Sequence, residues 1–280
     1  MMDASRGPVD CHTHAWTADL PMAAIRHYTP DGERTAAALL ADMARHGIAA
    51  AVVVQPSFLD DDNLYLADTL RLAPDRLRGV AAFPRVPAAA RVRELSDAGV
   101  RGARLNLFGD MALPDPRAAA WRDALDAMRK AGWHLVIAGS GAVLADALAR
   151  LSDLDLPLVI DHYGMPSTPA VQDCPGIRAL AAARDKTACW VKLSAPYRLL
   201  RGLQADGGAQ VVRELNQLGY AGRYLWGSDA PFTRFEHEQS YARVLDAYVG
   251  LLDAGLVDAD SLRRNAEYLY FDITGTAPGA

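Results

Sequence analysis

The stretch LVIDHYGMPSTPAVQDCPGIRALAAARDKTACWVKLS, residues 158–194, contains the pattern that decides the fold. It begins with an apolar run at Leu158 to His162 and ends with a second one at Trp190 to Ser194. Between them, Cys174 to Asp185 places its apolar residues at helical spacing. Strands without a polar face are buried on both sides, as in a parallel sheet that helices cover. The stretch therefore predicts one strand–helix–strand unit of an α/β protein.

The same alternation continues along the chain in both directions. About eight strand–helix units can be counted, and this is the number that closes a (β/α)8 barrel, so we expect an α/β fold with a single TIM barrel. The other expected strands are Val9 to His12, Ala51 to Gln55, Gly79 to Phe83, Val100 to Asn106, His134 to Ala138 and Tyr224 to Asp229. The other expected helical segments include Thr35 to His46, Arg117 to Ala131 and Gln210 to Leu218.

The length fits one barrel without a second domain. The chain has 280 residues, and a barrel of this class takes about 250. No Pro/Gly/Ser-rich linker and no shift in composition divides it. We expect one domain over residues 1–280, with flexible tails at 1–8 and 274–280.

Composition and charge argue against several classes of partner. The chain has 29 Lys and Arg against 34 Asp and Glu, a net charge of −5, and no basic block of the kind that nucleic acid or an anionic membrane requires. Neither a signal peptide nor an apolar run of about 18 residues is found. The 3 cysteines form no CxxC pair and no disulfide framework, which favours a reducing compartment. We expect a cytoplasmic protein without a nucleic-acid or membrane partner.

Polar and ionisable residues recur where the predicted strands end. In a (β/α)8 barrel the carboxyl ends of the strands form the active-site face. Each residue alone could cap a helix or lie in solvent, but their recurrence at successive strand ends indicates one shared site. These groups are His12-Thr13-His14, Gln55-Pro56-Ser57, Arg104-Leu105-Asn106, Asp161-His162-Tyr163-Gly164, Lys192-Leu193-Ser194 followed by Tyr197-Arg198, and Gly227-Ser228-Asp229.

A pair of histidines ends the first predicted strand. His12 and His14 alternate along it, so their side chains should share a face, while Cys11 should face the opposite side, into the barrel wall, as a small buried hydrophobe. Such a pair can hold a divalent metal or hydrogen-bond a substrate oxyanion, and either histidine could also be structural. Together with His162 and Asp229 at later strand ends, the pair indicates a reaction centre.

This combination resembles the amidohydrolase superfamily, in which His-x-His on the first strand and Asp on the eighth frame the reaction centre. Other segments resemble the branch of the family that hydrolyses pyrone dicarboxylate, sugar lactones and muconolactones. The resemblance covers nearly the whole chain and implies the distorted barrel of this superfamily. The segments are Tyr28-Thr29-Pro30, Val52 to Pro56, Asp62-Asn63, Arg78-Gly79-Val80, Gly99 to Asn106, Gly132-Trp133-His134, Ile160 to Gly164, Val191 to Ser194 and Leu225 to Asp229.

The resemblance implies a role for each residue of the centre. Asp229 would be the general base that takes a proton from water, and His162, His12 and His14 would hydrogen-bond the carbonyl oxygen. Cationic side chains would grip a substrate carboxylate, although Arg198 could equally be a surface arginine. The expected substrate-binding residues are Arg104, Arg198, Tyr28, Lys192, Ser57, Asn106 and Tyr197.

A metal is compatible with the resemblance but is not required by it. If a metal such as zinc is bound, its ligands would be His12, His14, His162 and Asp229. Metal-dependent members often supply a further ligand from a middle strand, whereas the fifth strand here ends in Ile137 to Gly141, which offers none. We therefore expect that no cofactor is required.

Three departures from the pyrone-dicarboxylate pattern change the expected substrate. Phe108 to Met111 replaces a second arginine, Ala138 replaces a tyrosine, and Ala230 to Phe232 replaces Trp-Pro-His. The first two departures remove contacts to one carboxylate, and the third makes the mouth wider and less polar. We expect the protein to hydrolyse another lactone, monoanionic or sugar-derived, rather than pyrone dicarboxylate itself.

Three alternatives remain open on the sequence. A sugar-acid lactone isomerase could use the same site, with a substrate hydroxyl in place of water. A metal-dependent decarboxylase of aromatic acids has the same His and Asp pattern, and a tightly bound metal would favour it. A barrel that only binds such acids would have little use for a base at Asp229. The expected partner is in every case a small-molecule lactone or acid, and the sequence does not determine the oligomeric state.

Overall fold

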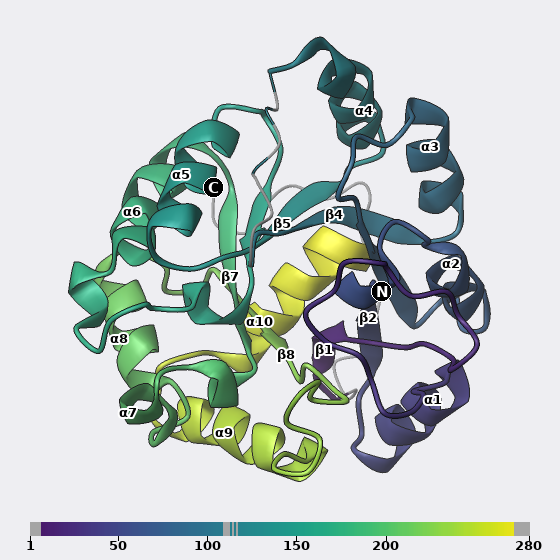
Figure 1. Cartoon of the computed structure of the whole chain (residues 1–280). Coiled ribbons are helices and arrows are strands. Elements are labelled where there is room, and N and C mark those ends of the chain that lie inside the picture. The colour runs from purple at the N-terminus through teal and green to yellow at the C-terminus, as the bar shows by residue number, and fades with distance from the viewer. Residues whose placement is uncertain (1–6, 109–112, 114, 116, 272–280) are drawn as a thin grey trace.

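The computed structural model of the chain describes residues 7–108, 113, 115 and 117–271. Its centre is an 8-stranded sheet in the order β1 to β8, and this arrangement confirms the expected (β/α)8 barrel (Figure 1). All neighbouring strands pair in parallel. The strands are β1 (Val9–Thr13), β2 (Ala50–Val54), β3 (Leu77–Ala82), β4 (Val100–Asn106), β5 (His134–Ala138), β6 (Leu158–Ile160), β7 (Cys189–Ser194) and β8 (Tyr224–Gly227).

Helices surround the barrel as an outer layer (Figure 1). The amphipathic segments form them as predicted; for example, the Thr35 side chain caps α1 by accepting a hydrogen bond from the Ala38 amide. The helices are α1 (Ala36–Arg45), α2 (Leu64–Arg71), α3 (Ala89–Asp97), α4 (Ala119–Lys130), α5 (Gly141–Leu151), α6 (Pro175–Lys186), α7 (Arg201–Gln204), α8 (Ala209–Gln217), α9 (Tyr241–Asp253) and α10 (Ala259–Ala266).

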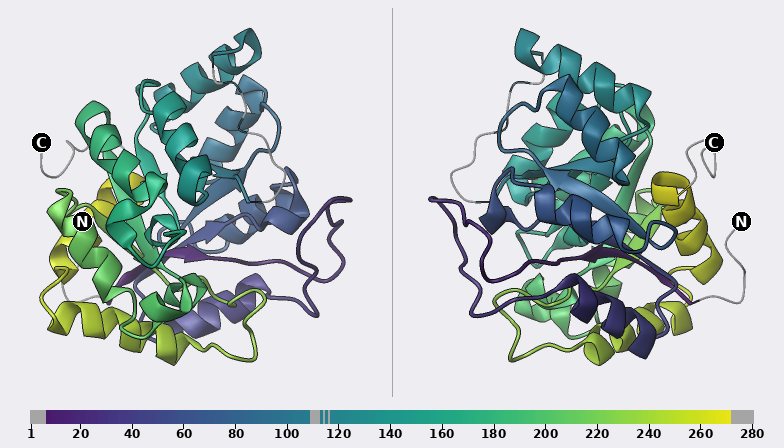
Figure 2. Two further views of the ribbon diagram at one scale, coloured as in Figure 1. Left: turned by 60° about the vertical axis from the view of Figure 1, so that its left-hand side comes forward. Right: turned by 90° about the vertical axis from the view of Figure 1, so that its right-hand side faces the viewer.

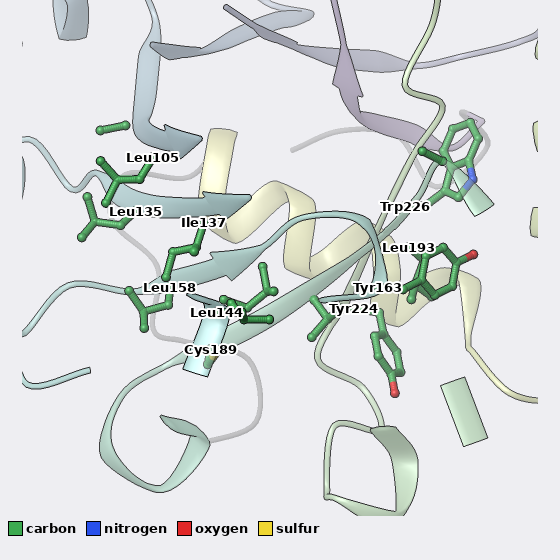
Figure 3. Packing of buried hydrophobic residues seen from close by; sticks show 14 of the residues in the cluster. Leu105, Leu135, Ile137, Leu144, Leu158, Tyr163, Cys189, Leu193, Tyr224 and Trp226 are labelled. Atoms are coloured by element: carbon green, nitrogen blue, oxygen red, sulfur yellow. The ribbon is translucent and has the colours of Figure 1, made fainter. Parts of the chain in front are cut away.

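The hydrophobic core has two layers, one on each side of the strands. The outer layer lies between sheet and helices, where Leu105, Ile137 and Leu158 of neighbouring strands pack near Leu144 of α5 (Figure 3). The inner layer fills the barrel with alternate strand residues and includes Tyr270, which follows α10. Helix α10 lies at the end of the barrel opposite the long loop after β1 (Figure 2). The inner layer thus fills the barrel at the end near α10, and the carboxyl ends of the strands lie at the other end, beside this loop.

The barrel closes between its first and last strands just past the end of β8. The Asp229 amide donates to the His12 carbonyl at 2.7 Å, and the His14 amide donates to the Ala230 carbonyl at 2.9 Å. A side chain inserted at Gly227 would lie 2.7 Å from Cβ of His12, so glycine is needed for this approach. The two strands that carry the predicted catalytic residues are therefore joined directly.

A β-bulge in β1 changes which way its side chains point. Asp10 pairs with Ala51 and Thr13 pairs with Val53. Two residues of β1, Cys11 and His12, therefore lie opposite the single residue Val52 of β2. Cys11 belongs to the inner core layer, and the expectation that it faces the barrel wall is wrong. Its burial is as expected, at 0% exposed.

Two strands end two residues earlier than predicted. Strand β6 ends at Ile160 and β8 ends at Gly227, so His162 and Asp229 lie in the turns that follow. Both residues have a positive φ, 50° for His162 and 62° for Asp229, which a β-strand cannot contain. Strain of this kind is often found at functional sites.

Most of each chain end lies outside the described residues. The predicted flexible tails, 1–8 and 274–280, lie outside the described residues except for Gly7 and Pro8. Among the described helices, none has the length and apolar character needed to cross a membrane. The division of the chain into a single domain stays a prediction.

Candidate active site

The loops after the strands surround a cavity of about 450 Å³ at the carboxyl end of the barrel. Most of the residues singled out from the sequence line it or lie directly beneath it. Those that line it are His14, Tyr28, Ser57, Arg104, Asn106, His162, Arg198 and Asp229. His12 and Tyr197 lie beneath the floor and contact Asp229, and Lys192 lies deeper, against Asp161 and His12.

Asp229 lies at the floor of the cavity, and its two carboxylate oxygens have different surroundings. Oδ2 accepts hydrogen bonds from the Tyr197 hydroxyl at 2.6 Å and from Nε of Arg198 at 2.9 Å. Oδ1 lies 3.4 Å from Nε2 of His12, 3.4 Å from Nε2 of His14 and 4.0 Å from Nε2 of His162. One oxygen is thus held in place, and the other faces three imidazoles.

The pKa of Asp229 lies well below its ordinary value. Burial acts to raise this pKa, but the Arg198 guanidinium and the neighbouring imidazoles lower it by more. The same carboxylate and burial raise the pKa of the Tyr197 hydroxyl well above its usual value. Asp229 is therefore ionised and Tyr197 is a neutral donor at any pH near neutrality.

The Nδ1 atom of each histidine faces a partner on the side away from Asp229. His14 Nδ1 lies 2.8 Å from the Val54 carbonyl, which can only accept, so this nitrogen carries the proton. His162 Nδ1 lies 2.9 Å from the Ser194 hydroxyl, and His12 Nδ1 lies 3.3 Å from Oδ1 of Asp161. In the tautomer with a single ring proton on Nδ1, the His14 Nε2 atom has a lone pair on the side of Asp229; the role of His14 as a donor to the carbonyl oxygen stays a prediction.

Burial keeps two of these imidazoles neutral. It lowers the pKa of His12 well below 6.5, although the Asp161 carboxylate opposes the effect. It lowers the pKa of His162 to about 4, with Asp229 opposing. The site therefore presents neutral imidazole nitrogens to an ionised carboxylate.

This set of donors fits a divalent metal ion. Ligand atoms of His12, His14 and Asp229 lie within 4.8 Å of one another, as do those of His12, Asp161 and His162. The buried Nε2 of His12 has no hydrogen-bond partner among the described residues. In a tetrahedral zinc site with bonds of about 2.0–2.1 Å, ligand atoms lie about 3.3 Å apart, close to the distances seen here. A metal or a water molecule would satisfy these nitrogens.

Asp161 is a site residue that the sequence analysis counted among the strand-end groups but to which it gave no role. It is fully buried, and its carboxylate lies between Lys192 Nζ at 3.1 Å and Arg104 Nε at 2.8 Å. Burial acts to raise its pKa, but Lys192, His12 and Arg104 lower it well below the ordinary value. Its position directly before His162, at the end of an apolar run, was the available signal.

Asp10 is a second buried carboxylate that the sequence reasoning missed. Oδ2 accepts from the Ser228 and Tyr241 hydroxyls, each at 2.6 Å, and Oδ1 accepts from the amides of Ser228 at 2.8 Å and His12 at 3.1 Å. These bonds join β1, the turn after β8 and α9. Asp10 therefore supports the two strands of the site from outside the cavity.

Of the three cationic residues predicted to bind substrate, Arg104 and Arg198 reach the cavity and Lys192 does not line it. Arg198 donates from Nη2 to the carbonyl and hydroxyl of Thr233, and its side chain is only 19% exposed, so it is not a surface arginine. Tyr28 donates from its hydroxyl to Glu236. Lining residues that the sequence reasoning did not select include His27, Phe58, Met165, Thr233 and Arg234. In the segment Phe108 to Met111, the positions after Phe108 lie outside the described residues.

Comparison with known proteins gives a consistent set of matches. An amidohydrolase family model matches residues 9–271. The chain is 32% identical over 241 residues to 2-pyrone-4,6-dicarboxylate hydrolase of Comamonas testosteroni, covering 80% of this chain and 77% of that one. It is 30% identical over 243 residues to 4-sulfomuconolactone hydrolase of Rhizobium radiobacter, covering 82% and 77%. A structure from Acinetobacter baumannii with bound citric acid, assigned as a 2-pyrone-4,6-dicarboxylic acid hydrolase, superposes with a TM-score of 0.85 at 25% identity over 94% of this chain and 98% of that one.

Proposed function

Since the chain belongs to the amidohydrolase family, we propose that it is a hydrolase that opens a carboxylated or polyhydroxylated lactone. The observation that carries the proposal is the arrangement of Asp229, with Oδ2 held by Tyr197 and Arg198 and Oδ1 open toward the cavity. Two relatives at or above 30% identity are named as hydrolases of lactones, which supports the same reaction class. We further propose that the substrate is not pyrone dicarboxylate itself.

Asp229, His12 and His14 are placed to hold and activate one water molecule. In the proposed step, this water donates one hydrogen toward Oδ1 of Asp229 and the other toward Nε2 of His12 or His14. As the water oxygen bonds to the lactone carbonyl carbon, its proton moves to Asp229. When the ring C–O bond breaks, the protonated Asp229 returns that proton to the leaving alkoxide. The products are an alcohol and a carboxylic acid of the same molecule, and the acid then releases the second proton of the water to solvent and becomes a carboxylate.

The carbonyl oxygen needs a donor while it carries negative charge. His162 is the imidazole that can supply one, because the Ser194 hydroxyl at 2.9 Å can donate to Nδ1 and leave the proton on Nε2. Arg104 and Arg198 line the cavity on either side and are proposed to bind the substrate carboxylate. Tyr28, Ser57 and Asn106 are proposed further contacts.

We propose that Asp161 acts as a positioning residue. With its carboxylate 3.3 Å from Nδ1 of His12, it favours the tautomer in which Nδ1 carries the proton and Nε2 faces Asp229. Lys192 and Arg104 compensate the charge of Asp161 at 3.1 Å and 2.8 Å. This is also the proposed role of Lys192, which lies too deep to touch a substrate, at 0% exposed.

A metal ion remains compatible with this proposal. If one is bound, His12, His14, His162 and Asp229 would hold it, and it would polarise the carbonyl and lower the pKa of bound water. The Arg198 guanidinium on Oδ2 of Asp229 opposes a cation at the same carboxylate. The same donor set favours, as a second candidate, metal-dependent decarboxylation of an aromatic acid.

We also propose a reducing location, the cytoplasm. Cys11, Cys174 and Cys189 are free and buried, which supports a compartment without disulfide formation.

The test is hydrolysis of a panel of sugar-acid and muconate-type lactones by chelator-treated protein, followed with a pH indicator and by chromatography of products. We expect ring opening of at least one lactone without added metal. Activity that appears only with zinc or manganese would make the four residues metal ligands. Release of CO2 from hydroxybenzoates under those conditions, with no lactone opened, would replace the lactonase with the decarboxylase. A lactone product of changed ring position would indicate an isomerase.

A further inference from the structure

A second compartment adjoins the catalytic cavity, and nothing in the proposed reaction uses it. Its volume is about 540 Å³, compared with about 450 Å³ for the catalytic cavity. The two share His27, Ser57, Arg104 and Asn106 as lining residues, so they adjoin at this border. We call it the side compartment; beyond the border it is lined by Ala23, Ala24, Ile25, Asp60, Ala82, Phe83, Pro84, Arg85, Leu105 and Leu107.

The lining of the side compartment is mainly apolar, unlike the floor of the catalytic cavity. Phe83, Pro84 and Leu107 come from the ends of β3 and β4 and the residues that follow, and Ala23 to Ile25 come from the loop after β1. The charged group Arg85 in its wall is already paired with Asp61 at 2.7 Å. A polar or anionic ligand would gain little here, whereas an apolar group would be removed from water.

Ile25 is the second observation that points to an apolar ligand. It is 89% exposed, more than any other large hydrophobic residue among those the structure describes, and it stands at this compartment. A single exposed apolar residue has no special meaning by itself. Here Ile25 adds its apolar surface to that of Phe83 and Pro84 in the lining of the side compartment.

Arg104 lies at the border and lines both compartments, so one ligand bound to it could extend into both. Ala82 pairs with Arg104 in the β3–β4 ladder, so the neighbour of the guanidinium on that side is a small side chain. Ala82 and Arg104 both line the side compartment, so open volume lies beside Arg104 at this border. A carboxylate bound at Arg104 could carry a bulky substituent directly into the side compartment.

We propose that the substrate is a lactone carboxylate with a bulky apolar substituent, aryl or branched alkyl, and that this substituent occupies the side compartment. The inference rests on the proposed lactone hydrolysis and makes its substrate class more specific. The reacting ring lies over Asp229, the carboxylate lies at Arg104, and the apolar group packs against Phe83, Pro84 and Ile25.

Binding and hydrolysis are measured separately, so that each proposal can fail alone. For binding, calorimetry compares 5-oxopyrrolidine-2-carboxylate, a lactam that resists opening, with its 3-phenyl and 4-phenyl derivatives. For hydrolysis, kcat/KM is compared for 5-oxotetrahydrofuran-2-carboxylate and its phenyl derivatives. We expect at least one phenyl lactam to bind about tenfold or more tightly than the parent lactam, because a buried phenyl group removes a large apolar area from water.

Two variants test where the phenyl group binds. Ala23→Leu partly fills the compartment from a backbone that is held by the Ala23 amide to Phe58 carbonyl hydrogen bond at 2.8 Å. Ile25→Ser removes apolar surface at a position that is 89% exposed, so we expect the free energy of unfolding to stay unchanged. Both should reduce the phenyl preference at least threefold and leave the parent lactam unaffected. The matched control is Leu72→Ser, at an exposed leucine outside the compartment, which should change neither value.

Each outcome has one meaning. If neither phenyl lactam binds more tightly than the parent, or if both variants keep the full phenyl preference, the side compartment is not a substrate subsite. If a phenyl lactam binds tightly and the variants weaken it, but no lactone is opened, the subsite stands and the proposed hydrolysis fails.

Discussion

At the scale of single residues, the two oxygens of Asp229 do different things because their neighbours differ. Tyr197 and Arg198 hold Oδ2, so the carboxylate cannot rotate, and Oδ1 stays directed at the imidazoles. Burial alone would give a protonated and inactive acid. Arg198 thus keeps the proposed base ionised, in addition to its proposed contact with a substrate carboxylate.

Replacing Arg198 should move the acid limb of the pH–rate profile. In the parent, the pKa of Asp229 lies well below its ordinary value and that of His162 is about 4, so kcat/KM should stay level from pH 7 down to about 5. In Arg198→Met the burial effect is no longer opposed by the guanidinium, so the pKa of Asp229 rises and the acid limb moves to higher pH. The exposed Arg213→Met serves as control. An unchanged acid limb in Arg198→Met would contradict the assignment of Asp229 as base.

Asp161→Asn should separate the positioning role from a merely structural one. The substitution leaves Lys192 and Arg104 buried without a counter-charge, which should cost about 3–5 kcal/mol of unfolding free energy. It should also lower kcat about 10–100-fold, by analogy with partners that orient metal-binding histidines, with little change in KM.

The double variant Asp161→Asn with Lys192→Met distinguishes the two effects. Removing the uncompensated lysine should restore part of the stability measured by urea unfolding, but kcat should stay low because His12 still lacks its partner. Recovery of kcat together with stability would show that Asp161 only supports the fold.

At the scale of elements, β1 depends on a close approach to β8. The bulge at Cys11 and His12 places the His12 ring beneath the cavity, and Gly227 leaves room for its backbone. The side chain of Asp10 then ties the same segment to Ser228 and Tyr241. Small changes in these elements should therefore change the position of Asp229.

Gly227→Ala should destabilise the protein and reduce activity together. The new Cβ would lie 2.7 Å from Cβ and 2.8 Å from N of His12, and neither atom belongs to a flexible side-chain end. We expect a loss of about 1–3 kcal/mol in urea unfolding, as for other overpacked sites, and a reduced kcat because His12 moves. Gly202→Ala in α7 is the matched control: nothing lies within 4 Å of its Cβ, so stability should be unchanged or higher. Equal stability of both variants would contradict the close-packing argument.

The sequence predicted elements well where hydrophobic pattern and polar boundary coincide. The strands Val100–Asn106 and His134–Ala138 have the predicted limits. The strand predicted over Leu158 to His162 is two residues too long. Asp161 and His162 are polar but buried, so they do not mark an exposed loop in the sequence. The bulge in β1 could not be read either, since it is caused by pairing with another strand.

The candidate site could be predicted only in part. The part that could be predicted follows from the fold. Residues that end strands converge in any such barrel, so the sequence brought Asp229, His14 and His162 together. The tautomers of the histidines and the role of Asp161 depend on contacts between strands distant in sequence, such as that between β1 and the turn after β6. Such contacts have no signature in a single sequence.

At the scale of the whole molecule, the same contact that closes the barrel brings the residues of the site together. His12 and Asp229 are held by a backbone hydrogen bond between opposite ends of the chain, 2.7 Å long. The inner core fills the barrel on the side of α10, so the catalytic cavity and the side compartment share the remaining end. In the proposed function, the polar floor at Asp229 and the apolar lining of the side compartment would contact the same ligand.

The most direct test of lactone opening by Asp229-activated water is kcat of Asp229→Asn on the best lactone of the panel. Asp68→Asn, in a surface ion pair with Arg71, controls for loss of a carboxylate. We expect the Asp229→Asn variant to lose about 10³-fold or more in kcat while circular dichroism shows an intact fold, and the control to match the parent. An Asp229→Asn variant that opens the lactone at the parent rate would contradict the account.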